Sequence, residues 1–305
     1  MNSKGVISTV TLDKCINFSL DKERYTPYTS FKGSFIIPIY YEEIFSIKFI
    51  IDGTAVHYGS VDRAKMTFKK EFYRLDISSR SYTLALGLNQ PKPQVNLDVS
   101  LSNLLSRNVT LKNITYETGT TTINYIYVLE NSTLWDAVVA YALKAYNKYP
   151  YIYKTNEIRI NVPSGAKSRS YDDSSIIEVY NGSTLSNLIS HIHMRDTDGN
   201  YEAYNIIDDY AVSRDIIRHK QIPLDMQWLS NTNKALTTRV NYSKRGTKYR
   251  GIKILGYSGE ELFDKFVYNF GSSENQSGTI HKLNISGKNN AIYTTMYEYV
   301  DAYKV

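Results

Sequence analysis

The amino-acid sequence predicts a mainly β fold with a small α+β insertion: two similar β-barrel-like domains that flank an α+β unit. Strand-like segments dominate both ends of the chain, and the clearest helical segment lies between them. At 305 residues the chain is longer than one average domain. We therefore divide it into residues 1–90, 91–165 and 166–305, and we expect C-terminal strands to complete the last domain.

The first predicted domain consists almost entirely of strand-like segments. The run "FKGSFIIPIYY" is apolar along most of its length, as in a strand buried on both faces. The run "IFSIKFIID" alternates and ends at Asp52-Gly53, a pair typical of hairpin turns. Further strand segments follow at short spacing: "TAVHYGSV", "AKMTFKKEF" and "YRLDIS". Short strands separated by turns, with no helix between them, favour a sandwich or a small barrel.

The segment "SYTLALGLNQPKP" marks the end of this domain. Tyr82, Leu84 and Leu86 alternate with smaller or polar residues, which is the period of a half-buried strand. The following Pro91-Lys92-Pro93 interrupts the pattern, because proline donates no hydrogen bond to a strand ladder. We predict that a strand over 82–86 closes the first β domain and that the chain leaves the domain at the prolines.

The middle region contains the clearest helix of the chain. Thr133 is a favourable N-cap, and Asp136 three residues later completes a variant of the capping box. Apolar residues then recur at helical spacing as far as Asn147. We expect Val138→Asp to be strongly destabilising because Val138 faces the core, and Lys144→Glu to be nearly silent. A shorter helix is expected in "LSNLLSRN", and strands are expected in "TTINYIYVLE" and "EIRINVP".

The last region begins after "PSGAKSRSYDDSS", which has the composition of a loop. One helix is predicted from Thr184 to His191, with Ser183 as its cap. The remaining segments predict strands: "SIIEVYN", "NYEAYNIID", "TTRVNYSK", "RGIKILGY", "GTIHKLNIS" and "AIYTTMYEY".

Composition excludes several classes of protein. The net charge of +6 is spread along the chain and only weakly favours an anionic partner. The single cysteine, Cys15, rules out an intramolecular disulfide framework. The N-terminus lacks the apolar core of a signal peptide, and the longest apolar runs are too short to span a bilayer. We therefore expect a soluble protein made in the cytosol.

The 28 tyrosines fit an AT-rich coding sequence, and they also suit half-buried sheet faces.

Candidate metal ligands are few. His191 and His193 alternate along one segment, so their side chains share a face if the segment is a strand. No third ligand stands at a suitable spacing in the sequence, and we interpret the pair as surface or polar-contact histidines. The run "DTDGN" at 196–200 resembles part of a calcium loop, but its glycine is misplaced and the closing glutamate is missing. It predicts a hairpin turn instead.

Catalytic candidates are equally sparse. The adjacent carboxylates Glu42-Glu43 and Asp172-Asp173 would point apart in a strand, so adjacency does not make them an acid–base pair. The sequence has no GxSxG, P-loop or GxGxxG motif. We therefore predict no enzymatic activity, no cofactor, and no catalytic, cofactor-binding or metal-ligating residues. The sequence does not identify interface residues.

The segment "YSKRGTKYRGIK" raises the possibility of nucleic-acid binding. It mixes basic residues with Tyr242 and Tyr249, as single-strand binding surfaces do. We interpret it as a solvated hairpin with its tip at Arg245-Gly246, and with Val240, Ile252 and Ile254 as core positions. Glycan binding by exposed tyrosines is a further alternative that no segment of the sequence localises.

Three runs resemble phage tail hub proteins of contractile tails: those of the Mu type, of defective Bacillus-type prophages and of phage-tail-like bacteriocins. "YRLDISSRSYTLALGLNQP" resembles a strand that leads into a Ser-Gly-Arg-like turn, with Ser79 before Arg80 where those hubs often have Gly. "STLWDAVVAYALKA" resembles the capped helix of their inserted α+β unit. "DYAVSRDIIRHKQIP" is similar to the Arg-rich segment that begins their second β domain, through Arg214, Arg218 and His219.

This resemblance implies a structural role without catalysis. It implies a homotrimeric ring in the tail baseplate, or in the corresponding tailocin particle, assembled in the cytoplasm of a bacterial host. The expected partners are a tail tube or tube-initiator protein, a central spike protein and other baseplate proteins. Neither membrane insertion nor a nucleic-acid partner is expected. The alternative is a β-rich glycan- or nucleic-acid-binding module of a virion or cell surface, and a hydrolase is the third and weakest candidate.

Overall fold

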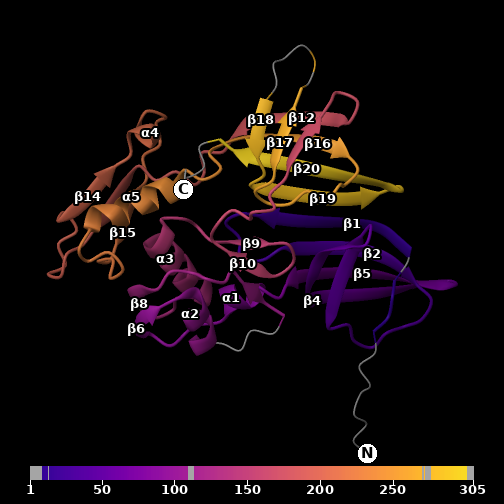
Figure 1. Ribbon diagram of the computed structural model, residues 1–305, viewed down its shortest axis with the longest axis horizontal. Helices are drawn as coiled ribbons and strands as arrows, with labels where there is room; N and C mark the ends of the chain where they lie inside the picture. The colour runs from indigo at the N-terminus through magenta and orange to yellow at the C-terminus, as the bar shows by residue number, and fades with distance from the viewer. Residues whose placement is uncertain (1–8, 13, 109–112, 270, 272–275, 301–305) are drawn as a thin grey trace, which may run out of the picture.

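The computed structural model describes residues 9–12, 14–108, 113–269, 271 and 276–300. Its largest element is a nine-stranded antiparallel sheet that combines strands from both ends of the chain (Figure 1). The first half of the chain contributes β1 (Lys14–Glu23), β2 (Ser30–Ile37), β3 (Ser46–Ile51), β4 (Thr54–Lys69) and β5 (Phe72–Ser81). The second half contributes β12 (Ile176–Ser183), β16 (Lys248–Leu255), β19 (Lys282–Lys288) and β20 (Ala291–Tyr299). The mainly β character predicted from the sequence is confirmed.

The strand order within this sheet is repeated. Across the sheet the strands run β12-β16-β20-β19-β1-β2-β5-β4-β3. Apart from the edge strand β3, the first half contributes four strands, which lie in the order β1-β2-β5-β4. In this block the third and fourth strands of the sequence exchange places across the sheet. The second half has the same order, β12-β16-β20-β19. The two four-stranded blocks are joined where β19 pairs with β1, from Asn17 opposite Lys288 to Glu23 opposite Lys282.

Turn residues set the hairpins of the first block. Asp52 and Gly53 both have positive φ, 46° and 77°, which confirms the predicted turn between β3 and β4. "TAVHYGSV" and "AKMTFKKEF" do not form separate strands, because β4 continues through both for 16 residues. It ends at Lys69, and the next residue, Lys70, has a φ of 53° at the turn into β5.

The predicted strand over 82–86 is wrong. Strand β5 ends at Ser81, and the chain turns into a short helix, α1 (Leu84–Leu88). Thr83 draws the chain out of the sheet, because its backbone N–H donates to Asn156 Oδ1 at 3.3 Å and its hydroxyl lies 2.7 Å from that of Ser81. The alternating leucines are buried, but Leu86 belongs to the core of the α+β unit rather than to a sheet face.

The α+β unit lies beside the large sheet and contains the predicted helices (Figure 1). Its elements are α1, β6 (Gln94–Val99), α2 (Leu101–Asn108), β7 (Thr115–Tyr116), β8 (Ile123–Val128), α3 (Leu134–Tyr146), β9 (Tyr151–Tyr153) and β10 (Glu157–Arg159). The capping box of α3 is confirmed: the N–H of Thr133 donates to Asp136 Oδ2 at 2.8 Å, and the N–H of Asp136 donates to Thr133 Oγ1 at 3.2 Å. Asn147 ends the helix in the left-handed conformation.

A second α+β unit is inserted between β12 and β16, where the sequence had predicted mostly strands. It contains β13 (His191–Met194), β14 (Tyr204–Ile207), α4 (Asp209–Val212), β15 (His219–Ile222) and α5 (Thr232–Ser243). The prediction of a strand in "TTRVNYSK" is wrong, because this segment is the second part of α5. Asn231 caps α5 by accepting from the N–H of Lys234 at 3.0 Å, and Ala235, Leu236 and Val240 bury one face.

Two further predictions in this region are wrong. The helix expected over Thr184–His191 does not form, and β13 begins at His191. The stretch before β13 is held instead by polar contacts, such as the N–H of Thr184 donating to Thr247 O at 2.8 Å. The stretch expected to be a loop contains β11 (Ser168–Tyr171). This polar strand pairs in parallel with β17 (Lys265–Tyr268), which also pairs with β18 (Gln276–Thr279).

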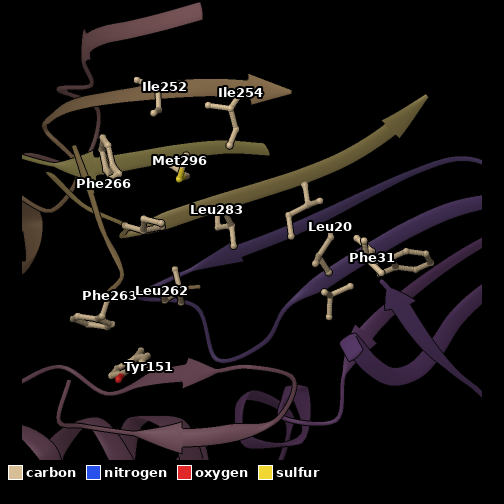
Figure 2. Close-up of a cluster of buried hydrophobic side chains, with 14 of the residues drawn as sticks. Leu20, Phe31, Tyr151, Ile252, Ile254, Leu262, Phe263, Phe266, Leu283 and Met296 are labelled. Carbon is tan, nitrogen blue, oxygen red and sulfur yellow. The ribbon is translucent and has the colours of Figure 1, made fainter. Parts of the chain in front are cut away.

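One hydrophobic core extends across both halves of the large sheet. Figure 2 shows side chains of this core from the central strands, among them Leu20, Phe31, Leu283 and Met296. Leu262, Phe263 and Phe266 pack against them from the β17 region, and Tyr151 contacts Phe263 with ring centroids 4.2 Å apart. The two halves of the large sheet therefore share one core.

A buried ion pair also joins the two halves. Lys22 on β1 is 2% exposed, and its Nζ lies 2.6 Å from Glu261 Oε2 in the segment before β17. The partners are 239 residues apart in sequence. A lysine with so little access to water requires this carboxylate to compensate for the loss of hydration.

Candidate functional site: sheet edges and a histidine cluster

The two ends of the large sheet are candidate assembly surfaces. In the described part of the chain, β12 forms its ladder with β16 alone, so its other backbone edge is unpaired. Ile177 and Val179 on this strand are 42% and 39% exposed. A strand edge with unpaired N–H and C=O groups and exposed apolar side chains is a template for pairing with another chain.

The opposite end of the sheet has a second unpaired edge. Strand β3 pairs only with the first part of β4. The ladder ends where Ser46 lies opposite Ser60, and one further hydrogen bond runs from the N–H of Val61 to Phe45 O. Beyond that point β4 pairs only with β5 among the described strands, and Asp62, Arg63 and Lys65 are exposed there. The two edges differ in composition, so a contact between them would be heterologous.

The basic–aromatic segment is not a hairpin. It forms the end of α5, a turn at Gly246 with a φ of 68°, and the start of β16. Val240, Ile252 and Ile254 are buried, as predicted.

Its basic side chains already have intramolecular partners. Lys244 Nζ lies 2.6 Å from Asp208 Oδ1, and Lys253 Nζ lies 2.9 Å from Glu178 Oε1. Arg250 Nε lies 2.6 Å from Glu298 Oε2. These pairs leave less positive charge free for phosphate than the sequence suggests.

The histidine pair gains a third member in the folded chain. His191 and His193 share one face of β13, and β15 places His219 opposite His191 in a parallel pair. The ring of His219 stacks on both, with centroid distances of 4.1 Å to His191 and 5.3 Å to His193 and interplanar angles of 9° and 10°. Sequence spacing could not identify this residue, because it follows His193 by 26 positions and lies on another strand.

Hydrogen bonds determine the tautomer of His191. Ser190 Oγ donates its only proton to Arg218 O at 3.0 Å and accepts from the N–H of Arg218 at 2.7 Å. His191 Nδ1 lies 2.8 Å from the same oxygen, and it is the donor when the Ser190 proton points to Arg218 O. In that tautomer the lone pair of His191 is on Nε2. Burial, with smaller contributions from His219 and His193, lowers the pKa of His191 and favours this neutral form.

The remaining sequence candidates have local structural roles. Asp196 Oδ1 accepts from the N–H groups of Asp198 and Asn200, both at 2.9 Å. These bonds close a turn between the paired strands β13 and β14, which confirms the predicted turn at 196–200. Asp172 Oδ1 accepts from the Ser174 hydroxyl at 2.7 Å, and the carboxylate of Asp173 accepts from the N–H of Gly271 at 3.1 Å. The two adjacent carboxylates thus bind different partners.

The residues that carry the hub resemblance also fill structural positions. The Ser79 hydroxyl donates to Ser60 O at 2.7 Å and lies 2.8 Å from Nε2 of the buried His57, whose Nδ1 is 3.1 Å from Thr29 Oγ1. Burial lowers the pKa of His57 to about 4. When Ser79 donates to Ser60 O, a neutral His57 donates to Ser79 through Nε2 and accepts from Thr29 through Nδ1. Arg80 binds Asp62 through two bonds of 2.9 Å.

The Arg-rich segment that precedes β15 is equally engaged. Arg214 donates to Tyr210 O at 2.8 Å, and its guanidinium lies 3.5 Å from the ring centroid of Tyr210. Arg218 Nη1 donates to the backbone carbonyls of Leu185, Ser186 and Leu188. Arg218 therefore links the segment that precedes β13 to the residues just before β15.

A cavity of about 540 Å³ lies between the two α+β units and is lined by side chains of α3 and α5. Tyr149 and Tyr242 stack at its wall with centroids 5.1 Å apart, and Tyr25 meets both rings edge-on. No pattern in the sequence predicted this cavity, because its walls come from distant segments. Among the described residues, no helix has the length and apolarity needed to cross a membrane.

Comparison with known proteins places the fold among phage tail proteins. No family model and no curated protein matches the sequence. The structure of a tail protein from Neisseria meningitidis MC58 is similar with a TM-score of 0.70 and 12% identity, over 94% of this chain and 93% of that one. The 43 kDa tail protein of prophage MuSo2 from Shewanella oneidensis is similar with a TM-score of 0.70 and 10% identity, over 93% of each chain.

A secretion-system protein shares the fold more distantly. It is an E. coli component of the type VI secretion system, described as structurally similar to the T4 bacteriophage tail proteins gp27 and gp5. Its TM-score is 0.57 at 7% identity, over 98% of this chain and 77% of that one. The chain therefore shares the fold of these tail proteins.

Proposed function

We propose that this chain is a non-enzymatic structural component of a phage tail: the baseplate hub of a contractile tail or tailocin. It would form a homotrimeric ring that adapts the sixfold tail tube to the threefold spike. Its partners would be the tail tube or tube-initiator protein, the central spike protein and other baseplate proteins. The similarity to two tail proteins over nearly the whole chain supports a tail role.

The repeated strand order is the observation that carries the proposal. A threefold ring can match a sixfold tube only if each chain offers two near-equivalent surfaces. The blocks β1-β2-β5-β4 and β12-β16-β20-β19 have the same order and lie side by side in one sheet. Three such chains would present six blocks, which is the number the tube requires.

The junction inside the chain suggests how the ring closes. Strand β19 of the second block pairs with β1 of the first. By the repeat, β4 corresponds to β19 and β12 corresponds to β1. The same pairing between chains would therefore join the free part of β4 on one subunit to β12 on the next. Such a head-to-tail contact is heterologous and produces a closed ring when the rotation between subunits fits.

Native mass spectrometry of the full chain tests this assembly. We expect a species at three times the chain mass of 35.0 kDa. Val179→Lys puts a charge on the β12 edge, where lysine opposes strand pairing, and should weaken the trimer at least about tenfold. Leu97→Lys introduces the same charge on β6, at a position that is 61% exposed, and should leave the trimer intact.

The other outcomes contradict the proposal in different ways. A chain that stays monomeric at high concentration would favour the β-rich glycan- or nucleic-acid-binding module. A dimer or hexamer would reject the hub. A trimer equally insensitive to both substitutions would retain the ring and exclude pairing through β12.

A further inference from the structure

The sheet β14-β13-β15 has one packed face and one open face. Ile192, Met194 and Ile222 point toward α5 and are buried with Leu236 and Val240. The alternate residues of the same strands form the other face, where His191 and His193 are half-buried and His219 is exposed. The three imidazoles are therefore gathered on the open face of this sheet rather than inside the core.

The hydrogen bonding of this cluster is incomplete. His193 Nε2 and His219 Nδ1 lie 3.1 Å apart and share one proton, since one must donate and the other accept. His193 Nδ1 is buried and has no hydrogen-bond partner among the residues that the structure describes. Whichever tautomer is present, one nitrogen of His193 remains unsatisfied, which is unfavourable in a buried polar group. His191 adds an Nε2 lone pair, because its Nδ1 proton is held by Ser190.

From this arrangement we propose that His191, His193 and His219 form a binding site for a divalent transition-metal ion such as Zn²⁺. Three imidazoles suit borderline metals, and three-histidine sites leave a further position open for water or another ligand. The Ser190 contact is an outer-shell bond that fixes the tautomer a ligating His191 needs.

Metal binding requires the rings of His193 and His219 to turn, while His191 keeps its contact with Ser190. In their stacked orientation, no group of three or more His, Cys, Asp or Glu side chains in the described part of the chain is arranged to hold a metal ion. The centroids are nevertheless only 4.1, 5.3 and 6.4 Å apart. Rotation of His193 and His219 about the broad χ2 wells of histidine would direct one nitrogen of each ring toward Nε2 of His191. The exposed side of His219 leaves room for this movement.

Calorimetric titration of the untagged full chain with Zn²⁺ at neutral pH tests the site. We expect one Zn²⁺ per chain, and His219→Gln and His193→Gln should each lower the affinity by at least the roughly 10–100-fold that loss of an outer-shell partner costs. Gln221→Ala removes a side chain opposite His193 in the β13–β15 pairing and should leave the affinity unchanged. Co²⁺ should give the visible absorption of a four-coordinate nitrogen site, and Mg²⁺ should not bind.

Circular dichroism establishes that each variant is folded. The site is rejected if the parent chain shows no saturable Zn²⁺ binding, or if His219→Gln binds Zn²⁺ as tightly as the parent. Equal binding of Mg²⁺ would also overturn it, because that result indicates nonspecific attraction of cations. These outcomes are independent of the trimer, since the three histidines belong to one chain.

Discussion

Replacing Lys22 with methionine is expected to lower the free energy of unfolding by about 3–5 kcal/mol. Lys22 is almost inaccessible to water, and the side chain of Glu261 is 13% exposed. The substitution leaves that carboxylate without the ammonium group 2.6 Å away. Because the pair joins β1 to the segment before β17, both halves of the large sheet should lose stability together. Chemical denaturation followed by circular dichroism measures the change.

A second substitution separates charge from packing. In Lys22→Met/Glu261→Gln no unpaired carboxylate remains, so the double variant should lose less stability than the two single variants combined. Arg239→Met breaks a more exposed pair with Asp225, in which the Arg239 side chain is 45% exposed, and should cost less than about 1 kcal/mol. If Lys22→Met cost as little as Arg239→Met, the buried pair would not support the sheet as described.

Val138→Asp is expected to cost more than about 3 kcal/mol, because it buries an unpaired carboxylate in the core of the first α+β unit. Val138 is fully buried, at 0% exposure, and packs in the same cluster as Leu86 and Ile126. Thermal and denaturant unfolding should both show the loss.

Leu88→Asp is the matched control for this variant. It introduces the same charge on α1 at a position that is 66% exposed, and it should change stability by less than about 0.5 kcal/mol. Lys144→Glu is unsuitable as a silent control, although the sequence suggested it. Lys144 Nζ donates to Tyr125 O at 3.2 Å and lies 3.5 Å from the ring centroid of Tyr125. Burial lowers the pKa of Lys144 to about 8. Equal losses in Val138→Asp and Leu88→Asp would contradict the proposed packing of α3.

Local signals in the sequence predicted local structure well. The turn at Asp52-Gly53, the turn at 196–200 and the Thr133–Asp136 capping box each depend on a few neighbouring residues, and all three form. Some predictions failed where a segment's partner was distant. The alternation at 82–86 fitted a strand, but Thr83 binds Asn156 and directs the leucines into another core.

The same limit applies to the second α+β unit and to the candidate site. The segment "TTRVNYSK" alone favours a strand, and its helical character depends on Asn231, Ala235 and Leu236 before it. His219 joins His191 only through the parallel pairing of β13 and β15. The β19–β1 ladder links residues near opposite ends of the chain, so no short window could reveal that the two strand-rich blocks share one sheet.

The threefold ring is the central claim, and an averaged image of isolated tail particles viewed along the tail axis tests it most directly. We expect three copies of this chain around the axis. Each copy should contribute two neighbouring β blocks, so that six similar lobes meet the tube above and a threefold outline meets the spike below. Six copies around the axis, two copies, or a position away from the axis would contradict the hub assignment.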